Sequence, residues 1–140
     1  MSPPAHLLIA VGELGIKEIP GSAHHPRILE YHATTRLHAT TDEVPWCAAF
    51  VNWCLAQAKV AGTGSAAAAS FRTWGVRSEP RIGCVVVFGK ADRDAAGTGH
   101  VGFLVGMDAV HVFVLGGNQG NAVTVAKRPR ESVVSYRWAA

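Results

Sequence analysis

The sequence has few charged residues and no long apolar run. Charged residues make up 16% of its 140 residues, and the formal net charge is only +3. No run of lysine and arginine is interleaved with aromatic residues, so nucleic acid is not an expected partner. No segment approaches the roughly 20 apolar residues that a membrane helix needs, so no membrane is expected either. The N-terminal segment lacks the basic start and continuous apolar stretch of a signal peptide, and we therefore expect synthesis in the cytoplasm.

Cysteine is also scarce, and metal-binding motifs are missing. The odd number of cysteines (Cys47, Cys54 and Cys84) argues against a disulfide framework. Cys47 and Cys54 are two helical turns apart, roughly 10 Å along a helix axis, which is too far for a disulfide. No HExxH or paired CxxC motif accompanies the seven histidines, so we expect no metal and no cofactor. Asp42 and Glu43 are too few for the about 6–8 oxygen ligands of calcium, and we interpret them as favouring the start of the next helix.

The chain divides into a helical first half and a strand-rich second half. Apolar spacing predicts helices over residues 4–14, 26–32, 48–59 and 66–74. Short β-branched runs separated by glycine-rich turns predict strands over residues 83–88, 100–106, 110–115, 123–126 and 133–138. Helices followed by a meander indicate one α+β domain over residues 1–140, with an antiparallel sheet packed on the central helix.

Three polar residues stand at the ends of these predicted elements. Cys47 begins the central helix, where unpaired N–H groups stabilise a thiolate. His100 begins an apolar strand after a glycine-rich loop, and Asn118 lies in the turn after the neighbouring strand. Each also has an ordinary explanation, as a small core residue, a structural histidine and a turn residue. Their order in the chain matches the layout of a papain-like Cys-His-Asn triad.

These residues lie in segments that resemble a known family. The segment DEVPWCAAFVNWCL, with GHVGFLVG and VLGGNQ further along, is similar to CHAP and NlpC/P60-type peptidoglycan amidases, especially a phage-associated subgroup that includes endolysins. The resemblance covers about residues 18–138 and implies a papain-like fold, with Cys47 as nucleophile, His100 as base and Asn118 as third residue. The chain departs from the family in two places. The family often has a carboxylate in or beside the third position, where this chain has Asn118 and Gln119, and it usually has aspartate where this chain has Cys84.

The resemblance implies a monomeric peptidoglycan hydrolase, either an N-acetylmuramoyl-L-alanine amidase or a stem-peptide endopeptidase. Trp46 is expected either to line the substrate cleft or to lie in the core, and Gln119 is expected to contact substrate or to replace Asn118. A phage endolysin is the expected setting, with holin-type release to the wall in the periplasm. The alternatives are an antibacterial effector amidase, delivered by a secretion system and paired with an immunity protein, and a non-catalytic wall-binding module.

Overall fold

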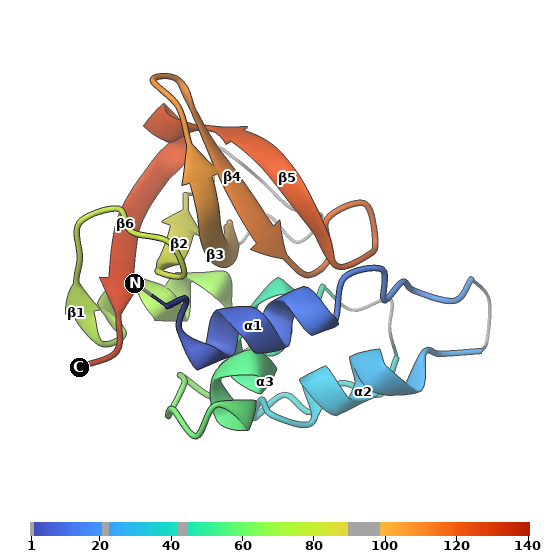
Figure 1. The fold of residues 1–140 in the computed structure, drawn as a ribbon. Helices are drawn as coiled ribbons and strands as arrows, with labels where there is room; N and C mark the ends of the chain where they lie inside the picture. The colour runs from blue at the N-terminus through green and yellow to red at the C-terminus, as the bar shows by residue number, and fades with distance from the viewer. Residues whose placement is uncertain (1, 21–22, 42–44, 90–98) are drawn as a thin grey trace.

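The computed structural model describes residues 2–20, 23–41, 45–89 and 99–140. Three α-helices come first: α1 (Ala5–Gly12), α2 (Pro26–His32) and α3 (Cys47–Gln57). The 3₁₀ helix η1 (Ala68–Thr73) follows α3, and a second one, η2 (Arg130–Ser132), lies between the last two strands. The strands are β1 (Val76–Arg77), β2 (Val85–Phe88), β3 (His100–Met107), β4 (His111–Gly116), β5 (Thr124–Pro129) and β6 (Val133–Trp138). Figure 1 shows α1, α2 and α3 gathered on one side of the sheet, which confirms the predicted α+β class.

The central helix α3 is mostly apolar and is correspondingly buried. Every residue from Cys47 to Leu55 is buried, because α1, α2 and strand β3 all pack against this helix. The helix was predicted to extend to Lys59, but it ends at Gln57. Lys59 has the left-handed φ of 61°, and Val60 donates its N–H back to the carbonyl of Leu55 at 2.9 Å. These features close the helix before the glycines that were expected to stop it.

The stretch predicted as a fourth α-helix is instead the 3₁₀ helix η1. Ala68 and Phe71 are its two buried residues, and they are three positions apart. A period of three matches the 3₁₀ geometry, in which residues i and i+3 share one side. The expected cap by Ser65 was wrong: η1 begins after Ala67 with no side-chain cap, and the Oγ of Ser65 instead accepts the N–H of Ala67 at 3.1 Å in the turn before it.

The sheet is antiparallel, as predicted, but its strand order is not a simple meander. The order is β1-β6-β2-β3-β4-β5, so β6 returns across the sheet to pair with β2. Strand β1 was not predicted, because its two exposed residues carry no alternating pattern. Strands β2 to β5 do follow one another in space, which places the start of β3 beside the end of β4.

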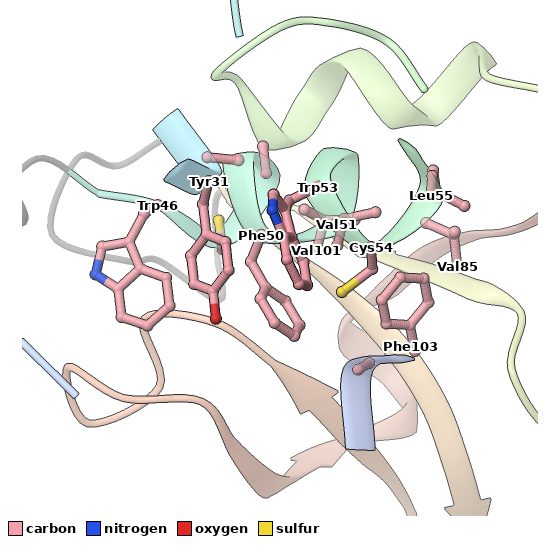
Figure 2. Close-up of a cluster of buried hydrophobic side chains, with 14 of the residues drawn as sticks. Tyr31, Trp46, Phe50, Val51, Trp53, Cys54, Leu55, Val85, Val101 and Phe103 are labelled. Carbon is pink, nitrogen blue, oxygen red and sulfur yellow. The ribbon is translucent and has the colours of Figure 1, made fainter. Parts of the chain in front are cut away.

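The two faces of the sheet bury separate apolar clusters. Val85 and Phe103 lie on the face toward α3, where Figure 2 shows them beside Cys54. Phe50 of α3 approaches Phe103 with ring centroids 6.4 Å apart. The opposite face buries a second cluster, made of Cys84, Val86, Phe88, Leu104, Val112 and Val114. The helices therefore lie against one face only, and the start of α3 lies near the end of β4.

Helix α1 is attached to the sheet by a buried histidine. The Nε2 of His6 donates to the carbonyl oxygen of Gly83 at 2.7 Å, and its ring packs against Phe103 and Trp138. Burial lowers the pKa of His6 below its ordinary value of 6.5, because the charged ring loses its water. At neutral pH the folded protein therefore holds this ring uncharged.

We expect His6 to make the fold less stable in mild acid. The unfolded chain takes up a proton near pH 6.5, whereas the folded chain does so only at lower pH. The free energy of unfolding should therefore fall as the pH drops below 6.5, and this contribution should level off once the folded ring is protonated. Urea unfolding between pH 7.5 and 4.5 measures the slope. The His6→Gln variant should show a shallower slope, and an unchanged slope would assign the acid sensitivity to other groups.

Candidate active site

The predicted nucleophile occupies the first position of α3. Cys47 follows Trp46, whose φ of −130° and ψ of 20° are not helical. Pro45 stands immediately before Trp46. Proline in this position keeps the helix from starting much earlier. Cys47 is only 3% exposed. Its thiol therefore lies at a positive helix end in surroundings largely shielded from water, where a thiolate is stabilised by the backbone N–H groups.

The predicted base occupies the first position of β3. His100 is 1% exposed and lies opposite Phe88 in the ladder between β2 and β3, with the two rings 6.0 Å apart. Its Nε2 lies 2.9 Å from Oε1 of Gln119. Gln119 lies in the turn after β4, and β4 is the neighbour of β3 in the sheet. The imidazole and its amide partner therefore come from two adjacent strand ends.

The amide of Gln119 has a defined orientation, and this orientation sets the tautomer of His100. Its Nε2 donates to the carbonyl oxygens of Val114 at 3.1 Å and Thr124 at 2.7 Å. These two acceptors require the NH₂ group, so the amide oxygen is the atom that faces the imidazole. Nε2 of His100 must then carry a proton, and Nδ1 becomes the basic nitrogen of the neutral ring.

At the imidazole the structure places Gln119, which the sequence offered as the alternative to Asn118. The amide that meets the imidazole belongs to Gln119, and Asn118 is the residue that turns the chain. Asn118 has a left-handed φ of 58°, which asparagine tolerates better than most residues. This turn directs the next side chain back over the strand ends. Gln119 is itself buried, and its amide is bonded to His100.

Two glycines before this turn let the backbone pass between α3 and the imidazole. A Cβ atom on Gly117 would lie 2.7 Å from both the Cβ of Phe50 and the ring of Trp46. A Cβ on Gly116 would lie 3.1 Å from Oε1 of Gln119 and 3.4 Å from Nε2 of His100. The strand end therefore contacts the first turn of α3 on one side and the His100–Gln119 pair on the other. Larger residues would push the two parts of the site apart.

Trp46 lies in the core and not in a substrate cleft. Its side chain is fully buried, and its Nε1 donates to Oε2 of Glu18 at 2.8 Å. The ring stacks on Tyr31 with centroids 5.7 Å apart, and Figure 2 shows the two rings side by side. Of the two roles expected for Trp46, the structure thus supports the one in packing, because no face of the ring is left for a substrate.

The sequence did not reveal the carboxylates that hold these aromatic residues. Oε1 of Glu13 accepts the hydroxyl of Tyr31 at 2.7 Å and pairs with Nε of Arg27 at 3.1 Å. Burial and the hydrogen bond to Glu13 raise the pKa of Tyr31, so the phenol stays protonated. Glu13 and Glu18 have no recognisable spacing to their partners in the sequence. Only the polar character of Glu13 within an apolar helix pattern gave any signal.

Neither of the other two cysteines begins a helix, as Cys47 does. Burial raises the pKa of both the Cys54 and the Cys84 thiol, which makes each a poor nucleophile. Cys84, the departure from the family's aspartate, lies in the apolar cluster on the far face of the sheet. A thiol suits that position because it needs no charged partner. All three cysteines lie in the described ranges as buried thiols.

Within residues 2–20, 23–41, 45–89 and 99–140, no three His, Cys, Asp or Glu side chains gather as a metal site would require. Asp42 and Glu43, the two carboxylates weighed for calcium, lie outside the described residues. No helix in the same ranges has the length and apolarity to cross a membrane.

Comparison with known proteins identifies the family. The family model of the CHAP domain matches residues 39–118, which is more than half of the chain. The match includes both Cys47 and His100 and ends one residue before Gln119. No curated protein matches the sequence. The chain therefore belongs to the CHAP family, whose papain-like domains are peptidoglycan hydrolases of the amidase or peptidase type.

Proposed function

We propose that the protein hydrolyses an amide bond of peptidoglycan with Cys47 as nucleophile and His100 as general base, oriented by Gln119. One observation carries this assignment. The Gln119 amide is fixed by Val114 and Thr124, and it makes Nδ1 the basic nitrogen of His100. A thiol hydrolase needs such an oriented base near its nucleophile.

The mechanism follows from these roles. Nδ1 of His100 takes the proton of the Cys47 thiol, and the thiolate attacks the carbonyl carbon of the scissile amide. The backbone N–H of Cys47 belongs to the first turn of α3, where N–H groups point out of the helix end. It donates to the oxyanion of the tetrahedral intermediate. The imidazolium then protonates the leaving amine, and a thioester to Cys47 remains. His100 next takes a proton from water, which attacks the thioester and releases the acid and the thiol.

The substrate in this proposal is a lactyl-peptide amide or a peptide bond of the stem. We place the protein as a monomeric phage endolysin that acts on the wall in the periplasm after holin-type release. The mild net positive charge of +3 suits a wall polymer that carries carboxylates.

Zymography on purified peptidoglycan tests the proposed function. We expect a cleared band, and mass spectrometry of the digest should show either separation of the glycan from its stem peptide, as an amidase gives, or a cut within the stem. Each step of the mechanism uses a thiol, an imidazole and backbone donors, so EDTA should change the rate by no more than about twofold. Retention in the gel without clearing would identify a wall-binding module. A loss of activity in EDTA that calcium restores would instead point to Asp42 and Glu43.

A further inference from the structure

Glu18 contacts both parts of the proposed active site without belonging to either. Its Oε2 accepts the indole N–H of Trp46, the residue before Cys47, at 2.8 Å. Its backbone N–H donates to the carbonyl oxygen of Asn121 at 2.9 Å, two residues beyond Gln119. One residue in the connection after α1 is therefore bonded to the nucleophile's neighbour and to the turn that carries the orienting amide.

The attachment to the turn extends beyond one hydrogen bond. Lys17 forms an antiparallel bridge with Ala122, and Val123 donates its N–H to the carbonyl of Ile16 at 2.8 Å. The backbone before Glu18 thus runs alongside the end of the turn as a short ladder. Such pairing fixes the position of the Glu18 backbone relative to the Gln119 turn.

The attachment to α3 is made through the indole ring of Trp46. Trp46 is fully buried, and its carbonyl accepts the N–H of Phe50 at 2.9 Å, the first hydrogen bond of the helix. The same ring lies against Gly117, where an added Cβ would approach to 2.7 Å. A shift of the indole would therefore move both the start of the helix and the strand end that contacts His100.

We propose that Glu18 is a positioning residue that sets the placement of the Cys47 thiol relative to His100. It does so by holding the Trp46 indole against Gly117 while its own backbone is paired with the Gln119 turn. The inference rests on the proposed roles of Cys47 and His100. Glu18 itself transfers no proton and contacts no substrate in this assignment.

The test compares Glu18→Ala with Glu18→Gln, measured on folded protein below its unfolding transition. Alanine removes the acceptor, and a displacement of the thiol should lower kcat by about 10- to 100-fold while KM changes by less than about threefold. The rate of Cys47 alkylation, followed against pH, should shift toward higher pH because the thiolate loses its alignment with the imidazolium. Glutamine keeps an acceptor oxygen for the indole and should retain most of the activity.

A second carboxylate in the same core provides the matched control. Glu13 also accepts from a buried aromatic residue, Tyr31, but its carboxylate pairs with Arg27, which lies outside the Gln119 turn. Glu13→Ala should lower the thermal unfolding temperature without shifting the alkylation profile. In a Trp46→Phe background, which lacks the indole donor, Glu18→Ala should have little further effect on kcat.

The outcomes separate this inference from the proposed function. Loss of wild-type activity in step with alkylation of Cys47 supports the nucleophile, whatever Glu18 does. If Glu18→Ala then loses stability but keeps the wild-type alkylation profile and kcat, Glu18 is only structural and the inference is overturned. If alkylation of Cys47 leaves wild-type activity intact, the proposed function fails first.

Discussion

Cys47→Ser should lose at least about 10³-fold in activity while keeping the fold. Serine is close to cysteine in size, so the first turn of α3 should pack as before, with Cys47 only 3% exposed in the native chain. The hydroxyl is far harder to deprotonate than the thiol, so His100 cannot generate an equivalent nucleophile. Release of dye from labelled peptidoglycan measures the loss, and circular dichroism with thermal unfolding confirms the fold.

The matched control replaces a cysteine far from the site. Cys84 lies in the cluster on the opposite face of the sheet, so Cys84→Ala should keep its activity and lose only about 1–2 kcal/mol of stability. Iodoacetamide should inactivate the protein in proportion to its labelling of Cys47, because burial raises the pKa of Cys54 and Cys84. Wild-type lysis by the Cys47→Ser variant would exclude the thiol mechanism.

Local sequence patterns predicted the main elements because those elements depend on local chemistry. Helix α2 has its predicted bounds, since Pro26 fits the first helical turn and apolar residues recur toward one side. The β-branched runs likewise predicted β2 to β6 within a few residues. The return of β6 to β2 could not be predicted in this way, because it depends on which strand edge remains open after the others have paired.

The same division applies to the active site. Cys47 and His100 were recognisable because each begins an element. A helix start stabilises a thiolate, and the first residue of a strand can face the neighbouring elements at the sheet edge. The choice between Asn118 and Gln119 depends on a φ angle and on two distant carbonyl acceptors, neither of which the sequence displays. Glu18 was not recognised because its partner, Trp46, is 28 positions away in the chain.

The second large effect is expected at the imidazole. His100→Ala removes the group that takes and returns the proton, and we expect a loss of about 10²–10⁴-fold in kcat. The ring is buried against Phe88, so the variant should also be less stable, and activity must be measured well below its unfolding temperature. A wild-type rate in the folded variant would remove His100 from the mechanism.

Gln119→Ala and Asn118→Gly together decide which amide orients His100. Without Gln119, the imidazole loses its acceptor at 2.9 Å and can adopt the wrong tautomer or rotation, so kcat should fall by about 10- to 100-fold, less than in His100→Ala. Val114 and Thr124 would also lose a donor, which should lower the unfolding temperature.

Asn118→Gly removes the neighbouring amide, and glycine accepts the left-handed φ of 58° without strain. It should therefore keep activity within about twofold. If Asn118→Gly instead carries the larger loss, the orienting role returns to Asn118. Equal wild-type rates in both folded variants would leave a Cys-His dyad.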